Sequence, residues 1–264
     1  MDLQLTNKSA LVTGSTAGIG FAIAKLLLQE GAAVYVNGRT TDRVTQAVNE
    51  LKRTIPEGKV SGIAADFSNA GDVHTLLSQI PAVDILINNV GIFEPKPFVE
   101  IPDEDWIKFF EVNVLSGIRL SRHYFPGMMQ KNWGRIIFIS SESAIHIPEE
   151  MIHYGMTKTA QLAVSRGLAE LTRGTQVTVN SVLPGPTRSE GVGFFLEDLA
   201  KSQHIESAQV ETNFFNTTRP TSLIQRFASP EEIAYLVAFV ASPLSAATNG
   251  ASLRVDGGIV KTIV

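Results

Sequence analysis

Tyr154 and Lys158 have the spacing at which two side chains share one face of a helix. Of the four tyrosines in the chain, only Tyr154 has a lysine four residues further on. A tyrosine, with an ordinary pKa of about 10, can act as acid and base near neutral pH only if positive charge stabilises its phenolate. Because the ammonium of Lys158 is such a charge, the pair predicts proton transfer. The same spacing also occurs on ordinary exposed helix faces.

Ser141 directly follows an expected strand, Arg135 to Ser140, and precedes Tyr154 by thirteen residues. Open α/β sheets bind their ligands at the carboxyl ends of strands. The sequence therefore predicts that the Ser141 hydroxyl holds a substrate oxygen near Tyr154. Ser140 and Ser143 lie close enough to be confused with it, and either could be an ordinary strand-end or turn serine.

The segment from Thr13 to Gly20 is a glycine-rich turn between the first expected strand and the first expected helix. Small residues at such a turn let backbone N–H groups and the helix N-terminus approach a diphosphate. This position favours a dinucleotide site over a merely structural turn. The residues expected to contact the coenzyme here are Gly14, Ser15, Thr16, Gly18, Ile19 and Gly20.

The elements that must position these groups alternate along the whole chain. Short apolar, β-rich runs predict strands at Ser9 to Thr13, Ala33 to Asn37, Val60 to Ala64, Ile85 to Asn88, Arg135 to Ser140, Val177 to Leu183 and Ala251 to Val255. Helical spacing predicts helices at Ile19 to Glu30, Asp42 to Arg53, Asn69 to Ile80, Asp103 to Met129, Met151 to Thr172, and after Ser229. The order predicts a doubly wound, Rossmann-type parallel sheet of about seven strands with helices on both faces. No linker interrupts it, so residues 1–264 are expected to form one domain.

Composition excludes several classes of function. The net charge of -4 is modest and spread out, so we expect neither nucleic acid nor a membrane surface as a partner. No apolar run approaches the ~18 residues of a membrane span, and the first residues lack the order of a signal peptide, which favours a cytoplasmic protein. The absence of cysteine excludes thiolate chemistry. The five histidines lack metal-ligand spacing, so no metal is expected, and His146 and His153 are predicted at a pocket rim or in solvent.

Together these residues resemble the short-chain dehydrogenase/reductase family in its single-domain form. The resemblance rests on Thr13 to Gly20, Asp66, Asn88 to Gly91, Asn113, Ser141, Tyr154, Lys158, Pro184-Gly185 and the segment from Arg226 to Gly258. It implies hydride transfer between a nicotinamide coenzyme and a small-molecule carbonyl or secondary alcohol. The C-terminal segment commonly packs across a tetramer interface in this family, which implies a homotetramer, or a homodimer.

The resemblance also implies roles for individual residues. Tyr154 would be the acid and base, Ser141 would orient the carbonyl, Lys158 would bind the ribose hydroxyls, and Asn113 would hold a water in a proton relay. The coenzyme would be lined by Asp66 and Phe67 at the adenine, by Asn89 and Gly91, and by Pro184, Gly185 and Thr187 beside the nicotinamide, in addition to Tyr154 and Lys158. Val90 departs from the usual alanine, which should alter packing without abolishing binding. Taken singly, Asp66 could be a helix-capping residue and Asn113 a satisfied buried amide.

The end of the second expected strand predicts that NADP(H) is preferred, with NAD(H) possible. An NAD enzyme typically carries a carboxylate there to bind the ribose hydroxyls, but this chain has Gly38. Arg39 follows, and a guanidinium can pair with a 2′-phosphate through two parallel hydrogen bonds. Asn37 or Thr40 could add a contact. The alternative is an exposed arginine in a turn.

Residues 188–226 show no strand signal and are predicted to form a mobile substrate-binding flap. Its apolar residues predict a substrate that is apolar around its carbonyl, such as a ketone or 3-oxoacyl compound; they are Phe194, Phe195, Leu196, Phe214 and Phe215. The phenylalanines could instead pack on one another or on a neighbouring subunit. Glu149 and Glu150 should lie near the mouth of the site and discourage anionic substrates.

Two other functions remain open at this point. The chain could be a coenzyme-binding sensor or scaffold without turnover, because a fold does not prove an activity. It could also be a non-redox enzyme on the same scaffold, such as an epimerase or a dehalogenase. Ser141, Tyr154 and Lys158 argue against the sensor, and a dehalogenase would be expected to carry Arg in place of Lys158.

Overall fold

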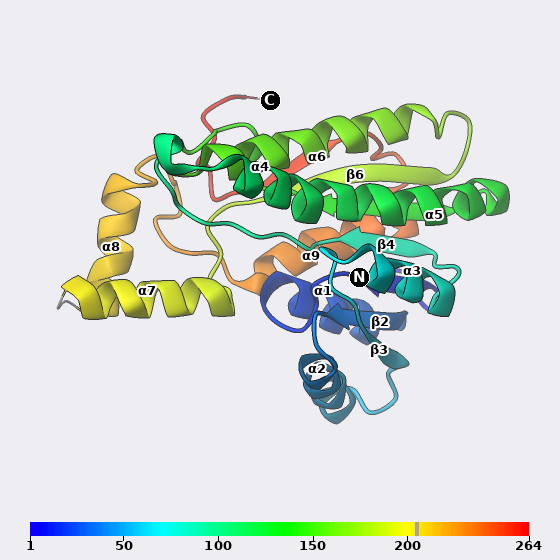
Figure 1. The fold of residues 1–264 in the computed structure, drawn as a ribbon. Helices are drawn as coiled ribbons and strands as arrows, with labels where there is room; N and C mark the ends of the chain where they lie inside the picture. Colours follow the sequence, from blue (N-terminus) through cyan, green and yellow to red (C-terminus); the bar gives the residue numbers. More distant parts are fainter. Residues whose placement is uncertain (204–205, 264) are drawn as a thin grey trace.

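The computed structural model describes residues 1–203 and 206–263, and within residues 194–203 it describes side chains only at 196, 200 and 201. In the described residues, seven parallel strands form one sheet in the order β3-β2-β1-β4-β5-β6-β7 (Figure 1). Their bounds are Ser9–Val12 (β1), Ala33–Gly38 (β2), Val60–Ala64 (β3), Ile85–Asn88 (β4), Gly134–Ile139 (β5), Val177–Pro184 (β6) and Ser252–Val255 (β7). Every strand of the sequence prediction is present, so the doubly wound, Rossmann-type fold is confirmed.

Helices cover both faces of the sheet. On one face lie α1 (Gly18–Gln29), α2 (Thr41–Thr54) and α9 (Pro230–Ala241), and on the other lie α3 (Ala70–Gln79), α5 (Ser116–Lys131) and α6 (Ile152–Glu170). Because helices cover both faces, β5 and β6 are buried at every residue, and most of their residues are apolar or small, with Arg135 and Asn180 as buried polar exceptions. In the part of the chain described, none of the helices has the length and apolar character needed to cross a membrane.

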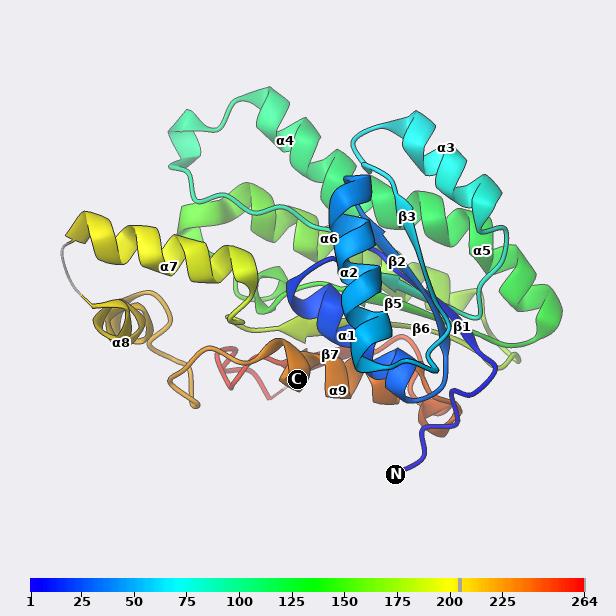
Figure 2. The same ribbon diagram turned by 90° about the horizontal axis from the view of Figure 1, so that it is seen from below.

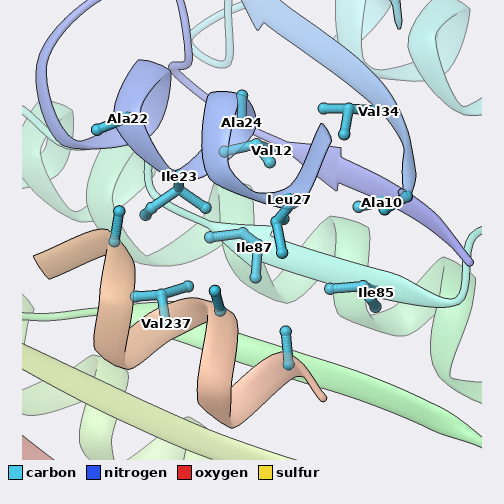
Figure 3. Close-up of a cluster of buried hydrophobic side chains, with 14 of the residues drawn as sticks. Ala10, Val12, Ala22, Ile23, Ala24, Leu27, Val34, Ile85, Ile87 and Val237 are labelled. Carbon is cyan, nitrogen blue, oxygen red and sulfur yellow. The ribbon is translucent and has the colours of Figure 1, made fainter. Parts of the chain in front are cut away.

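The contact between α1 and α9 anchors the half of the sheet that carries the glycine-rich turn. Ile23 and Leu27 of α1 are fully buried against Val237 of α9 and Ile87 of β4 (Figure 3). Burying an aliphatic side chain of this size contributes about 1.5–3 kcal/mol. Ser229 begins α9 with a capping box to Glu232, as the sequence predicts. The start of α1 is therefore held firmly relative to β1 and β4.

The helix predicted from Asp103 to Met129 is divided in the structure. α4 spans Asp103–Phe110, a π-helical turn spans Glu111–Leu115, and α5 follows. A π turn inserts one residue into the helical repeat and so rotates the side chains that come after it. The prediction of a single continuous helix was wrong because apolar periodicity does not reveal such an insertion. The turn places Asn113 in the interior.

The segment 188–226 forms α7 (Glu190–Gln203) and α8 (Ser207–Thr217), which lie together at one end of the molecule in both ribbon views (Figures 1 and 2). Together with Phe227, which directly follows it, the segment forms a small core of buried side chains that also contains Leu196, Ala200, Val210 and Phe215. The Phe214 ring stacks on Phe227 and meets Phe215 edge to face. Part of the alternative expectation, that the phenylalanines pack on one another, therefore holds; the side chains of Phe194 and Phe195 lie outside the described residues.

Candidate active site

Two adjoining cavities, of about 550 and 440 Å³, lie at the carboxyl ends of the strands. The first contains Ser141, Tyr154 and Lys158, and the second contains the glycine-rich turn and Arg39. Both are lined by Ile19, Asn89, Gly91 and Ser189. They therefore form one continuous cleft where the strand order reverses between β1 and β4, which is where such sheets bind dinucleotides.

The glycine-rich turn is built for close approach of backbone. Gly14 has a φ of +59°, which favours glycine, and a Cβ on Gly20 would lie 2.3 Å from the Gly14 carbonyl oxygen. The Asn89 side-chain amide donates hydrogen bonds to the carbonyl oxygens of Thr13 (2.9 Å) and Gly14 (3.0 Å) and so ties the turn to the end of β4. Of the predicted residues in this turn, Gly14, Thr16, Gly18, Ile19 and Gly20 line the second cavity.

Ser15 lies beneath the turn and does not line either cavity. It is fully buried; its hydroxyl donates to the Val12 carbonyl at 2.7 Å and accepts from the Asn37 backbone N–H at 2.9 Å. The Asn37 side chain is also occupied: it accepts from the Gly14 N–H and donates to the carbonyls of Ile63 and Ala65. The expectation that Asn37 is available to a phosphate was therefore wrong, because its polar atoms hold the turn and β3 together.

At the end of β2, Gly38 leaves no room for a side chain. A Cβ there would lie 2.4 Å from Cγ2 of Thr16 and 3.2 Å from Cγ2 of Val44. Arg39 is exposed and lines the second cavity. Thr40 caps α2 by accepting from the Arg43 N–H.

Asp66 and Phe67 line the second cavity after β3, and Val90 lines it after β4. The Asp66 carboxylate accepts from both the backbone N–H (2.9 Å) and the hydroxyl (2.8 Å) of Ser68. These bonds lower the pKa of Asp66, and the nearby charge of Arg39 acts in the same direction. Asn69 is the residue that caps α3, so Asp66 is not the helix cap that the sequence left open. The larger Val90 side chain packs against Gly14.

In the first cavity, Ser141 and Tyr154 come from the loop after β5 and the first turn of α6. The Ser141 hydroxyl donates to the Glu142 carboxylate at 2.5 Å and accepts from the Ser143 N–H at 3.1 Å. The neighbouring Ser140 donates its hydroxyl proton to the Lys158 carbonyl oxygen, which fixes the loop against α6. Burial raises the pKa of Tyr154 above its ordinary range, the Glu142 charge adds to this, and a hydrogen bond with Ser141 opposes it.

Lys158 lies one helical turn beyond Tyr154 and is buried. Its ammonium donates to the Ile139 carbonyl at 3.0 Å and to Gln161 Oε1 at 3.3 Å. Burial lowers the pKa of Lys158 to about 8. A Cβ on Gly91 would lie 3.2 Å from Nζ, so the ammonium lies directly beside the wall that the two cavities share.

Asn113 lines neither cavity, and its side-chain amide is satisfied within the protein. Its Oδ1 accepts from the Ile92 N–H, and its Nδ2 donates to the Ile92 carbonyl and to Thr157 Oγ1. The alternative of a satisfied buried amide therefore describes the side chain. The Asn113 backbone carbonyl, by contrast, accepts from Gln161 Nε2 at 2.6 Å, and Gln161 in turn accepts from Lys158.

Pro184 at the end of β6 and Gly185 and Thr187 in the turn that follows line the first cavity. A Cβ on Gly185 would lie 2.6 Å from the Asp256 carbonyl oxygen, so the turn packs directly on the chain after β7. The Thr187 hydroxyl donates to the Gly185 carbonyl at 2.9 Å.

His153 is fully buried, which contradicts its prediction as a rim or solvent residue. Its ring packs 4.1 Å from that of Phe109 and meets Trp106 edge to face. Burial lowers the pKa of His153, which is consistent with a neutral ring among aromatic neighbours. The sequence missed this because nothing local in it indicates that Trp106 and Phe109 of α4 pack on the first turn of α6. Across residues 1–203 and 206–263, no cluster of His, Asp and Glu could hold a metal ion.

Three residues of the site were missed by the sequence analysis: Gln161, Glu142 and Arg219. Gln161 joins Lys158 to Asn113. Glu142 and Arg219 form a buried ion pair, 3.3 Å from Oε1 to Nε, in the first cavity. The sequence did contain a signal for Glu142. A carboxylate directly after Ser141, at the end of a buried strand, is unusual and could have been predicted to contribute to the site. Nothing local in the sequence indicates that Arg219, 77 residues away, reaches it.

The fold and these residues agree with known proteins. Residues 8–199 match the family model described as short chain dehydrogenase. The chain is 51% identical to the uncharacterized oxidoreductase YvaG and 48% identical to the uncharacterized oxidoreductase YvrD, both of Bacillus subtilis (strain 168), with 100% of each chain covered. It also superposes on the crystal structure of L-sorbose reductase from Gluconobacter frateurii complexed with NADPH and L-sorbose, at a TM-score of 0.94 and 30% identity over 100% of both chains.

The arrangement places a tyrosine hydroxyl, a serine hydroxyl and a buried ammonium around one cavity, next to a second cavity lined by the glycine-rich turn. With the match over most of the chain, the conclusion is that this protein belongs to the short-chain dehydrogenase/reductase family of oxidoreductases.

Proposed function

We propose that the protein is an NADP(H)-dependent oxidoreductase that interconverts a ketone and a secondary alcohol, with Tyr154 as acid and base. The observation that carries this proposal is the convergence of Ser141, Tyr154 and Lys158 on one cavity that continues into the glycine-lined cavity. A protein that only sensed a coenzyme would not need these three groups around the first cavity, next to the coenzyme cavity.

The cleft formed by the two cavities suits a dinucleotide, with the diphosphate at the glycine-rich turn of the second cavity and the nicotinamide reaching the first. Gly20 lets the start of α1 pack directly on the turn, since a Cβ there would collide with the Gly14 carbonyl, and the glycines lining this cavity let backbone N–H groups approach a diphosphate. When bound, the coenzyme would supply or accept the hydride at the substrate carbon. Two features favour NADP(H) over NAD(H). Thr16 leaves no room at Gly38 for the carboxylate side chain that would bind the ribose hydroxyls of NAD(H). Arg39 offers a guanidinium at the cavity wall that can pair with the 2′-phosphate of NADP(H). NADPH in the complex of L-sorbose reductase supports this choice.

The chain's own groups would handle the proton and the orientation of the substrate. In reduction, Tyr154 would donate its proton to the carbonyl oxygen. Burial raises the pKa of Tyr154 in the protein alone, so its phenolate would have to be stabilised by Lys158 together with the bound oxidised nicotinamide. Ser141 would donate a hydrogen bond to the same oxygen. Lys158, beside Gly91, would bind the ribose hydroxyls, and Asn113 would act through Gln161 by holding Lys158. Asp66 and Phe67 would border the adenine, and Pro184 to Thr187 would border the nicotinamide.

The apolar side chains that line the first cavity support an apolar substrate body. They include Phe93, Pro95, Met151, Val192, Leu196, Val210, Phe214 and Phe227. Glu150 also lines the cavity, so strongly anionic substrates are disfavoured. Phe215 packs into the core of the α7–α8 segment and does not line the cavity. Of the five apolar flap residues named from the sequence, Leu196 and Phe214 line the cavity, and the side chains of Phe194 and Phe195 lie outside the described residues.

We further propose that residues 1–264 act as one domain in which 188–226 opens to admit substrate. Assembly as a homotetramer is supported by apolar side chains that stay exposed on and after α9: Tyr235, Phe239 and Leu244. Covering such side chains is a common reason for association.

The test is a spectrophotometric screen of ketones and secondary alcohols with NADPH and NADH, reading nicotinamide absorbance. The expected result is turnover of apolar ketones that is faster with NADPH and lost in Tyr154→Phe. Coenzyme binding without turnover of any substrate would instead identify a sensor. Conversion of a substrate without net change in absorbance would identify a non-redox enzyme such as an epimerase.

A further inference from the structure

Glu142 is a buried carboxylate inside the first cavity, next to the serine that the proposed function uses. It is 4% exposed, and each of its oxygens has a different partner. Oε1 accepts from Arg219 Nε at 3.3 Å, and Oε2 accepts from the Ser141 hydroxyl at 2.5 Å. Arg219, itself 7% exposed, also donates to Glu150 at 3.1 Å. Two carboxylates, Glu142 and Glu150, therefore share one guanidinium beside Ser141.

The bond between Ser141 and Glu142 competes with the reaction. A serine hydroxyl has one proton, and Ser141 gives it to Glu142 while its oxygen accepts from the Ser143 N–H. To donate to a substrate carbonyl, Ser141 must withdraw that proton from Oε2 of Glu142. A buried carboxylate oxygen would then lack a donor, which is unfavourable unless another donor replaces the hydroxyl.

We propose that Glu142 is a specificity-determining residue that selects ketones bearing a hydroxyl group on the carbon next to the carbonyl. Such a substrate places two oxygens on adjacent carbons, opposite the two protein oxygens Ser141 Oγ and Glu142 Oε2. The substrate hydroxyl donates to Glu142, and Ser141 is released to donate to the carbonyl oxygen. A simple ketone offers no donor and leaves Oε2 unpaired. This inference rests on the proposed function and narrows its substrate class from ketones to α-hydroxy ketones. The reduced product is then a vicinal diol, and the rest of its carbon chain lies against the apolar side chains of the first cavity.

The reaction balances without any further group. Hydride from the coenzyme adds to the carbonyl carbon, the proton of Tyr154 passes to the carbonyl oxygen, and the proton of the substrate hydroxyl stays on its oxygen throughout. Glu142 therefore accepts a hydrogen bond but takes no proton, so it acts on binding and orientation rather than on proton transfer.

The experiment compares 1-hydroxyhexan-2-one with hexan-2-one, which differ only in the hydroxyl group. The measured quantity is the ratio of their kcat/KM values in the wild-type protein and in Glu142→Ala. Comparing the two proteins removes the intrinsic difference in reactivity between the ketones. Because a hydrogen bond to a charged group is worth about 1.5–3 kcal/mol, the ratio should fall by roughly 10- to 150-fold in the variant. A purely structural effect of the substitution would slow both ketones equally and leave the ratio unchanged.

Two further variants separate Glu142 from the general charge of the cavity. Glu149→Gln removes an exposed carboxylate seven residues away and should leave the ratio within two-fold of wild type. Glu150→Gln removes the other partner of Arg219 and should also keep the ratio, because it leaves the contact between Ser141 and Glu142 in place. An equal fall in the ratio in Glu150→Gln would overturn the proposal in favour of a charge effect. Thermal unfolding and NADP⁺ affinity establish that each variant is folded.

A binding measurement tests the inference even without turnover. Calorimetry of the protein with NADP⁺ should give at least ten-fold tighter binding of hexane-1,2-diol than of hexan-2-ol, and Glu142→Ala should remove most of that difference. Equal affinities would overturn the role of Glu142. If neither ketone were reduced, the proposed function would fail separately, whereas reduction of both with an unchanged ratio would leave that function in place and reject only this inference.

Discussion

The ammonium of Lys158 lies 5.6 Å from the centroid of the Tyr154 ring, one turn further along α6. It is held there by the Ile139 carbonyl at the end of β5 and by Gln161 on its own helix. The ammonium therefore faces both the tyrosine and the wall that the two cavities share, so one cation can act on the proton donor and on the coenzyme.

Tyr154→Phe should remove nearly all turnover while coenzyme affinity stays within a few-fold of wild type. The substitution deletes the proton donor and keeps the ring, and general acid catalysis is typically worth about 100- to 10,000-fold. Steady-state rates and coenzyme titrations check both parts. Substantial activity in the variant would reject Tyr154 as the acid.

Lys158→Ala should damage coenzyme binding and rate together, because the same ammonium serves both. We expect the KM for NADPH to rise and kcat to fall, each by at least ten-fold, since hydrogen bonds to charged groups are worth about 1.5–3 kcal/mol. A change in kcat alone, with unaltered coenzyme affinity, would count against a contact between Lys158 and the ribose.

Lys158 should also make stability depend on pH. Its pKa is about 8 in the folded protein, below its ordinary value of 10.5. Between these values the unfolded chain binds more protons than the folded one, so the free energy of unfolding should rise with pH across this window, by about 3 kcal/mol in total. Urea unfolding of wild type and Lys158→Met at pH 7, 8.5 and 10 isolates this effect. A difference between the two proteins that is constant or falls with pH would show that burial does not shift this group.

Arg39→Ala should weaken NADPH binding by roughly 10- to 150-fold and barely change NADH binding, since only the former has the 2′-phosphate. Arg53→Ala is the matched control, because Arg53 is an exposed arginine of α2 that pairs with Glu50 on the same helix. It should leave both affinities unchanged. Equal weakening of the two coenzymes in Arg39→Ala, or a higher wild-type kcat/KM with NADH, would mean that Arg39 does not contact the phosphate.

Gln161→Leu should lower kcat/KM by about ten-fold through Lys158, because it removes a hydrogen-bond partner of the ammonium and leaves the Asn113 carbonyl unpaired. Gln161→Glu should restore part of the coenzyme affinity, since a carboxylate can also accept from Lys158. If the leucine variant lowered thermal stability with no change in KM for NADPH, Gln161 would be only a packing residue.

The sequence by itself determined the alternation of strands and helices, the glycine-rich turn, and the pairing of Tyr154 with Lys158. Each of these depends on residues that are close in the chain: apolar periodicity sets the elements, and a four-residue spacing sets the helix face. Because parallel strands bring their carboxyl ends to one edge, Ser141 and Gly14 could be assigned to the same cleft without a structure.

Only the tertiary structure decided how the polar groups of the cleft are shared. The Asn37 side chain makes its hydrogen bonds with the glycine turn and with β3. The His153 ring packs on an aromatic ring of α4. Glu142 pairs with Arg219, which lies just after α8. These contacts join segments whose separation in the chain carries no periodic signal, and they depend on how α4 and α8 dock. A hydrogen bond forms or fails over a few tenths of an ångström, so its partner is fixed by packing rather than by residue type.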